Sequence, residues 1–292
     1  MDSVTNKDAE TNKKLVIEYY ERSHIGYRLF WYGKNDLAMH YGFWGAGTTN
    51  RSEALINENR FLAEKANIKK EDRVLDAGCG VGGSSIWLAR TVGCSVLGIS
   101  IAPSNVREAS ENAKRNNVSD LAAFELRDYM KTDLPDETFN GVWAIESFCH
   151  APDKKTLFLE MHRLLKPGGR IIVADGFQKR PTANEAEECL WQRTLSGLGV
   201  YQTQWWDEYR EYLRECGFKN ILRWDMTGQV KKTVYYIFWL GILFTPIALF
   251  YIFLEKCFGR RSVMLGNWRA AIAQRRAFEK GLWLYGVYYA EK

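Results

Sequence analysis

The sequence has few of the residues that mark metal sites and disulfide-rich folds. It holds six cysteines and four histidines among 292 residues, and no two cysteines have the C-x-x-C spacing of zinc ligands. We therefore expect no metal site and no disulfide framework. The first residues are polar and lack the apolar stretch of a secretory signal. These absences predict a cytoplasmic protein.

The charge is also modest. Lys and Arg number 40 against 35 Asp and Glu, which gives a net charge of +5, without a run of five like charges. With no nucleic-acid-binding motif in the sequence, we expect no nucleic-acid partner. A mildly basic protein suits an anionic membrane surface or substrate. The apolar fraction of 46% is enough for one large α/β domain with insertions.

The middle of the chain alternates between strand and helix patterns, which is typical of a parallel sheet with crossover helices. Strands are expected over 73–76, 95–99, 122–126, 141–145, 170–174, 219–224 and 282–289. Helices are expected from Gly83 and over 103–116, 154–165 and 205–216, preceded by helices over 13–28 and 51–67. The fold class predicted is α/β, a Rossmann-like seven-stranded sheet with an aromatic N-terminal segment and an apolar C-terminal cap.

Two segments, 177–204 and 228–281, leave this alternation at one edge of the sheet and are candidates for a substrate cap. We divide the chain into four parts. These are an N-terminal segment covering the active site (1–50), a ligand-binding core (51–227), an apolar cap (228–281) and a final core strand (282–292).

A glycine-rich loop, Asp76-Ala77-Gly78-Cys79-Gly80-Val81-Gly82-Gly83, joins the first strand to its helix. Glycines let the backbone approach a ligand closely, and the helix start offers free amides. Dinucleotide-binding proteins share this pattern. Here, however, Asp76 precedes the glycines, and a carboxylate at that position attracts an ammonium group and repels a pyrophosphate.

This loop, the stretch 98–105 and the stretch Ala144–Asp153 resemble class I S-adenosylmethionine methyltransferases. The resemblance covers about residues 40–225 and is strongest to the branch of sterol C24-methyltransferases and γ-tocopherol methyltransferases. It implies that S-adenosylmethionine is the cofactor. The cofactor-binding residues that it implies are Asp76, Gly78, Gly80, Ser100, Ile101, Asn105, Asp128 and Tyr129. The class usually ends its second strand with a carboxylate that binds the ribose, where this chain has Ser100.

Glu146 and His150 follow the fourth strand, at the edge of the sheet where ligands bind in such folds. We predict catalytic roles for both. A carboxylate stabilises a carbocation formed when an alkene is methylated, and an imidazole accepts a proton or orients a water. The alternatives are a solvated loop carboxylate and a core or capping imidazole. Candidate walls for an apolar substrate are Tyr19, Tyr20, Tyr41, Trp44 and Phe148, although core packing explains each equally well.

Residues 233–254 form an uncharged apolar run with basic flanks at Lys231, Lys232, Arg260 and Arg261. Its length fits one membrane crossing. A single crossing, however, would place the seventh strand on the opposite side of the membrane from its sheet, and Pro246 interrupts a helix. We therefore expect two short helices that cap the acceptor pocket or lie on a membrane surface, with a dimer interface as the alternative.

The predicted function is methyl transfer to a lipophilic acceptor, first of all carbon methylation of a sterol or other isoprenoid. The alternatives are a phenolic prenyl-lipid of the tocopherol type and an amine or alkaloid. A cofactor-binding protein without activity is the alternative from another class.

Overall fold

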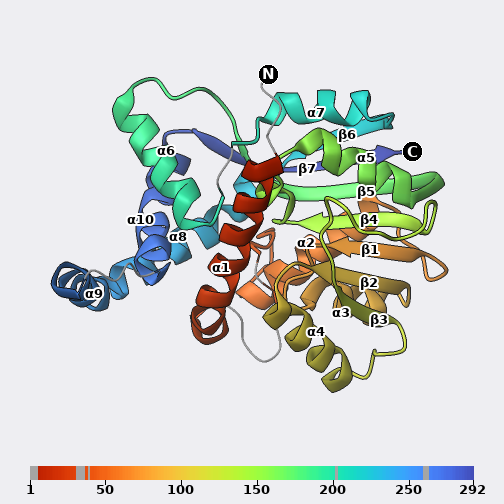
Figure 1. Ribbon diagram of the computed structural model, residues 1–292, viewed down its shortest axis with the longest axis horizontal. Coiled ribbons are helices and arrows are strands. Elements are labelled where there is room, and N and C mark those ends of the chain that lie inside the picture. Colours follow the sequence, from red (N-terminus) through yellow and green to blue (C-terminus); the bar gives the residue numbers. More distant parts are fainter. Residues whose placement is uncertain (1–5, 31–36, 39, 201–202, 259–262) are drawn as a thin grey trace.

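The computed structural model describes residues 6–30, 37–38, 40–200, 203–258 and 263–292. A seven-stranded sheet with the order β3-β2-β1-β4-β5-β7-β6 forms its centre (Figure 1). All neighbouring strands are parallel except at β7, which is antiparallel to β5 and β6. The predicted fold class is therefore confirmed. The strands are β1 (Arg73–Ala77), β2 (Ser95–Ser100), β3 (Ala122–Leu126), β4 (Phe139–Ile145), β5 (Leu165–Gln178), β6 (Lys219–Asp225) and β7 (Trp283–Glu291).

Helices cover both faces of the sheet, because successive apolar side chains of a strand point to opposite faces. In β1, Val74 belongs to the core on one face, together with side chains of α2 (Arg51–Lys65) and α3 (Gly83–Thr91). The next residue, Leu75, belongs to the core on the other face, with α5 (Lys154–Leu164) and α7 (Trp206–Glu215). The remaining crossover helix, α4 (Pro103–Arg115), packs along β3 and β2. The result is a three-layer α/β/α arrangement.

Strand β5 is longer than the predicted strand over 170–174. Its register with β4 moves from Phe139↔Leu165 to Gly141↔Arg170, so residues 166–169 bulge out of the ladder. Gly168 has a φ of +72°, a left-handed conformation that glycine adopts at low cost. The predicted strand over 170–174 therefore begins only after this bulge. At the other end, β5 continues until Gln178 pairs with Trp283 of β7.

A second group of helices gathers at one end of the sheet, at the left of Figure 1, with α1 (Asn6–Phe30) between it and the strands. It contains α6 (Glu185–Gly197), α8 (Thr227–Leu243), α9 (Thr245–Phe258) and α10 (Val263–Glu279). A Cβ atom at Gly197 would lie 2.3 Å from the Gly266 carbonyl oxygen, so glycine permits the close crossing of α6 and α10. We call α8, α9 and α10 the cap.

The apolar run forms two helices, as predicted, and the chain bends by 53° between α8 and α9. The break falls at Phe244, just before Pro246, which sits in the first turn of α9 where no amide donor is required. Among the described residues no single helix is long and apolar enough to cross a bilayer. Only the bent pair reaches that length and composition. Arg260 and Arg261 lie outside the described residues.

Candidate active site

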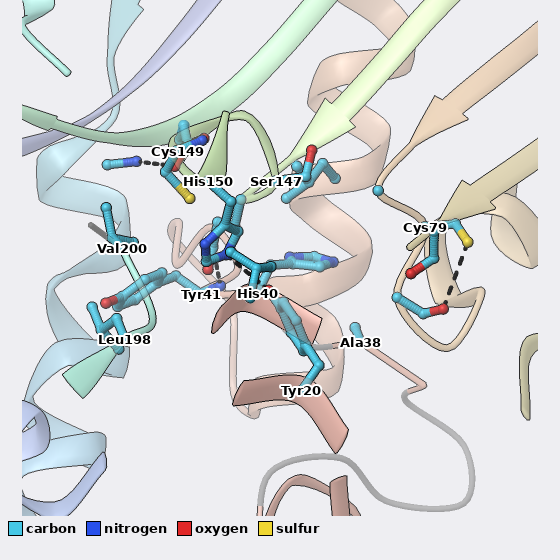
Figure 2. Close-up of a pocket in the computed structure, with 18 of the residues that line it drawn as sticks. Tyr20, Ala38, His40, Tyr41, Cys79, Ser147, Cys149, His150, Leu198 and Val200 are labelled. Atoms are coloured by element: carbon cyan, nitrogen blue, oxygen red, sulfur yellow. Dashed lines mark hydrogen bonds between the residues drawn. The ribbon is translucent and has the colours of Figure 1, made fainter. Parts of the chain in front are cut away.

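A cavity opens at the carboxyl ends of β1 and β4, where the strand order reverses and ligands bind in open α/β sheets. Helix α1, the segment around His40, α6 and α10 enclose it from the other side (Figure 2). The predicted residues that line it are Tyr20, Tyr41, Asp76, Gly78, Gly80, Ser100, Ile101, Asn105, Tyr129, Glu146 and His150. Residues that lie far apart in the sequence, from Tyr20 to His150, therefore meet in one cavity.

The glycine-rich loop forms the floor of the cavity beside β4. Gly78 has a φ of +101°, and a Cβ atom there would lie 2.3 Å from Cβ of Ser147. Gly80 also has a positive φ, of 51°. The Ser147 hydroxyl donates to the Ala77 carbonyl at 2.6 Å and joins the loop to the end of β4. A side chain is therefore excluded at Gly78, and the loop borders the cavity there.

Asp76 lies at the buried end of this loop and is 3% exposed. Its Oδ2 accepts a hydrogen bond of 2.5 Å from the Ser85 hydroxyl. Burial raises the pKa of Asp76 to about 6, against the opposing effects of Ser85 and of the nearby His40 charge. A buried carboxylate is stabilised by a cation. The loop and Asp76 thus fit the ammonium end of S-adenosylmethionine, the cofactor implied by the sequence.

Asp128 does not line the cavity, and the structure does not support its predicted contact with the adenine. Its Oδ2 pairs with Lys13 Nζ of α1 at 2.9 Å, and its Oδ1 accepts a hydrogen bond from the Met130 amide. The neighbouring Tyr129 does line the cavity, with its hydroxyl donating to the Ser147 carbonyl at 3.0 Å. Asp128 therefore joins α1 to the segment after β3, outside the lining of the cavity.

Glu146 is a hydrogen-bonded carboxylate in the cavity wall, not a solvated loop residue. It follows β4 directly, with a φ of +47° that is unusual for a residue with a side chain. Its Oε1 accepts hydrogen bonds from the Tyr41 amide at 2.8 Å and from the Tyr285 hydroxyl at 2.9 Å. These contacts hold a strained residue in place, as is common at functional sites.

Tyr285 joins Glu146 to a second buried carboxylate. Its hydroxyl also lies 2.8 Å from Oε1 of Glu58, which is fully buried. A phenol has one hydrogen to donate, so it serves only one carboxylate, and the other must carry a proton to hydrogen bond with the phenol oxygen. Burial and the charge of Glu58 raise the pKa of Glu146 well above its usual value. The raised pKa favours the protonated form of Glu146 when the cavity holds no positive charge.

His150 lies in a short 3-10 helix, η1 (Phe148–His150), and is buried. Its Nδ1 is 2.9 Å from the Gly199 carbonyl, which can only accept, so Nδ1 carries the hydrogen. Nε2 then accepts from the Tyr20 hydroxyl at 2.9 Å. Burial lowers the pKa of His150 to about 4. The imidazole is therefore neutral at physiological pH, and Tyr20 and His150 form a pair able to relay a proton.

Three of the aromatic residues predicted to form the cavity wall do not line it. Phe148 is completely buried against Tyr129 and Phe158. Tyr19 packs against Gly199, where a Cβ atom would lie 2.8 Å from its ring. The Trp44 indole donates to the Thr233 hydroxyl at 2.8 Å and anchors α8. Core packing or anchoring thus accounts for each, while Tyr20 and Tyr41 remain in the cavity wall.

Other lining residues were not predicted, because they come from the distant cap, α6 and β7. Trp191, Gln274 and Trp283 complete the wall opposite the glycine-rich loop. Gln274 accepts a hydrogen bond of 2.7 Å from the Tyr41 hydroxyl. No local sequence pattern marked these residues, although the prediction that 177–204 and 228–281 form a cap pointed to their segments.

Comparison with known proteins identifies the class. Residues 75–173 match the family model of a methyltransferase domain. The chain is 32% identical to the sterol 24-C-methyltransferase of Saccharomyces cerevisiae over 241 residues, which cover 80% of this chain and 62% of the relative. It is 35% identical to methyltransferase GfsG of Streptomyces halstedii over 197 residues, 67% of this chain and 70% of the relative. The geranyl diphosphate C-methyltransferase of Streptomyces coelicolor has a similar structure, with a TM-score of 0.71, 17% identity, and coverage of 96% and 97%.

The fold, the glycine-rich loop and these similarities define a transferase that binds S-adenosylmethionine. The chain belongs to the class I S-adenosylmethionine-dependent methyltransferases, in the branch that includes the sterol 24-C-methyltransferases. It spans about three fifths of the length of the first sterol enzymes that it matches, 62% and 63%.

Proposed function

We propose that this protein methylates a carbon atom of a sterol or other isoprenoid alkene through a carbocation. The observation that carries the proposal is the Glu146 carboxylate, which borders an aromatic-walled cavity beside the glycine-rich loop. Two of the similar proteins act on isoprenoid compounds by name, a sterol and geranyl diphosphate. We also propose the four-part division 1–50, 51–227, 228–281 and 282–292, with the first and third parts enclosing the acceptor.

Several residues would hold the cofactor. Asp76 binds the methionyl ammonium, and the backbone at Gly78 and Gly80 follows the methionyl chain. Ser100, Ile101 and Asn105, at the end of β2 and the start of α4, would meet the ribose and the adenine. Tyr129, which lines the same cavity, would lie near the adenine. The Ser100 hydroxyl accepts a hydrogen bond from the Ala102 amide and keeps its own hydrogen for a ligand oxygen.

S-adenosylmethionine supplies an electrophilic methyl group on a sulfonium. An alkene carbon would take that methyl group as the methyl–sulfur bond breaks and S-adenosylhomocysteine leaves. The neighbouring alkene carbon would then be cationic until loss of a proton restores a double bond. Positive charge in the cavity favours the ionised form of Glu146, which then stabilises the cation. The faces of Tyr20 and Tyr41 contribute to this stabilisation. The neutral Tyr20–His150 pair accepts the proton.

The test is product analysis with a donor carrying a deuterated methyl group. Sterols, prenyl diphosphates, tocopherols and amines are offered in parallel, and products are analysed by mass spectrometry and nuclear magnetic resonance. We expect a deuterated methyl group on a new carbon–carbon bond of an alkene acceptor. Products methylated only on oxygen or nitrogen would replace this proposal with the phenolic or amine alternative.

The raised pKa of Asp76 predicts that cofactor affinity depends on pH. Binding an ammonium needs the carboxylate, whereas a pKa of about 6 leaves Asp76 mostly protonated at low pH. The affinity for S-adenosylhomocysteine should therefore fall about tenfold between pH 8 and pH 5, measured by isothermal titration calorimetry. Asp175 is a second buried acid with a pKa near 6, and Asp175→Asn should retain the dependence. An affinity that stays constant over this range would contradict the role of Asp76.

We further propose that the cap contacts the cytoplasmic surface of a membrane. Helices α8 and α9 expose large apolar side chains, with Trp239 61% and Leu243 71% exposed. The others are Tyr236, Ile242, Ile247, Leu249, Phe250 and Phe253. Exposed Lys231 and Lys232 lie at the start of α8, where anionic headgroups would attract them. Such a continuous apolar surface is uncommon on monomeric proteins and suits entry of a lipid acceptor.

Flotation with vesicles tests the membrane contact. The protein should float with phosphatidylserine-containing vesicles at low salt, and the double variant Trp239→Ser, Phe250→Ser should bind at least about tenfold more weakly. Leu222→Ser removes an equally exposed apolar side chain from β6 and should bind normally. Failure of the unaltered protein to float, together with a dimeric mass in size-exclusion chromatography, would instead favour a subunit interface.

A further inference from the structure

His40 carries a buried ring nitrogen for which no function has been assigned. The side chain is 5% exposed and lines the cavity. Its Nδ1 lies 2.6 Å from Oε2 of Glu58, while Nε2 is enclosed and meets no hydrogen-bond partner among the described residues. A buried polar atom without a partner is costly and rare. A ligand atom at this position would therefore stabilise the site.

Glu58 orients the imidazole of His40 through the contact at Nδ1. Its Oε2 also accepts a hydrogen bond from the Gly42 amide at 2.9 Å, and its Oε1 contacts Tyr285. When this buried contact is an ion pair, both ring nitrogens of His40 carry a hydrogen, so Nε2 is a donor. Nε2 of His40 is thus suited to an anionic oxygen.

The position of His40 indicates which anionic group of a ligand its Nε2 would bind. The preceding residues run against the start of α3, since a Cβ atom at Gly83 would lie 2.1 Å from the Leu37 carbonyl oxygen. The first amides of a helix favour negative charge. Asp76 lines the same cavity as His40. The charge of His40 lowers the pKa of Asp76 against the larger effect of burial. In Figure 2 the His40 ring lies between the loop that carries Cys79 and the side of the cavity that carries His150.

We propose that Nε2 of His40 binds the carboxylate of the methionyl group of S-adenosylmethionine, while Asp76 binds the ammonium of the same group. The proposal rests on the proposed cofactor role of Asp76. The zwitterionic end of the cofactor then meets one positive and one negative side chain, and the start of α3 adds to the attraction for the carboxylate. Glu58 acts as a positioning residue, since it reaches the ligand only through His40.

Two ligands that differ by one carboxylate provide the test. S-adenosylhomocysteine has the full methionyl-type end, whereas 5′-deoxy-5′-(3-aminopropylthio)adenosine keeps the ammonium and lacks the carboxylate. In His40→Asn an amide replaces Nδ1 and nothing replaces Nε2. Calorimetry should show about 10- to 100-fold weaker binding of S-adenosylhomocysteine, the loss expected for one charged hydrogen bond. Binding of the aminopropyl analogue should change less than about threefold.

Two further variants guard against a general loss of structure. Glu58→Gln can still accept the Nδ1 hydrogen but lacks the charge, so it should weaken S-adenosylhomocysteine selectively and by a smaller factor. His162→Asn alters a histidine on α5 outside the cavity and should bind both ligands normally. Equal weakening of both ligands by His40→Asn, or unchanged binding of both, would overturn the proposal. If the unaltered protein binds neither ligand, the proposed cofactor role of Asp76 has failed first.

Discussion

Replacing Asp76 with asparagine should weaken the binding of S-adenosylhomocysteine by at least about 100-fold. The amide keeps the size of the side chain and can still accept from Ser85, but it leaves the buried ammonium of the ligand without a counter-charge. Removing one partner of a buried ion pair costs about 3–5 kcal/mol. Calorimetry with the purified variant measures the loss directly, and thermal unfolding without ligand confirms that the fold is retained.

Asp128→Asn is the matched control for this experiment. The resemblance to related enzymes places Asp128 at the adenine, whereas the structure pairs it with Lys13 outside the cavity lining. Because partly exposed ion pairs contribute little, this variant should bind within about fivefold of the unaltered protein. A loss at Asp128 as large as the loss at Asp76 would restore its predicted role. Near-normal binding by Asp76→Asn would remove the basis for the proposed cofactor orientation.

Replacing Glu146 with glutamine should lower kcat by about 10²- to 10³-fold and leave the affinity for S-adenosylhomocysteine within about threefold. The amide oxygen can still accept from the Tyr41 amide and the Tyr285 hydroxyl, so the geometry is retained while the negative charge is lost. Charge stabilisation in an enclosed site is commonly of this size. Steady-state kinetics on the acceptor found by product analysis measures kcat, and calorimetry measures the affinity.

The control for Glu146 is Glu64→Gln, which removes an exposed carboxylate from α2. Its kcat should equal that of the unaltered protein. Full turnover by Glu146→Gln with normal cofactor binding would exclude charge stabilisation by this residue. The reaction would then have to proceed without a carbocation next to β4, as in direct methylation of a phenolic oxygen.

The sequence predicted the sheet well because its signals are local. A short apolar run such as Val74-Leu75 indicates a buried strand, and the glycines after Asp76 indicate the turn to α3. Neither signal depends on distant parts of the chain. The bulge in β5 was missed for a related reason. Proline and glycine at 167–169 indicate a turn. Only the register with β4 shows that pairing already starts before these residues, at Leu165.

The site was predicted only in part, since its polar network joins residues that are far apart in the chain. Tyr285 and Glu58 are separated by 227 positions and meet through one hydroxyl. No spacing rule connects them. Aromatic residues pose a different problem, because a sequence does not show which face of an element they occupy. Tyr41 faces the cavity, whereas Trp44, three residues later, turns to the cap and holds α8.

Tyr285 on β7 joins Glu58 of α2 to Glu146 after β4, two residues that lie far from it in the sequence. A chain that stopped after α10 would keep the whole glycine-rich loop, Glu146 and His150, yet it would lack the hydroxyl that joins the two buried acids. It would also lose β7, the strand that pairs with both β5 and β6. During synthesis, therefore, the hydrogen bonds that join Glu58 and Glu146 through Tyr285 cannot form until β7 has been added and has entered the sheet.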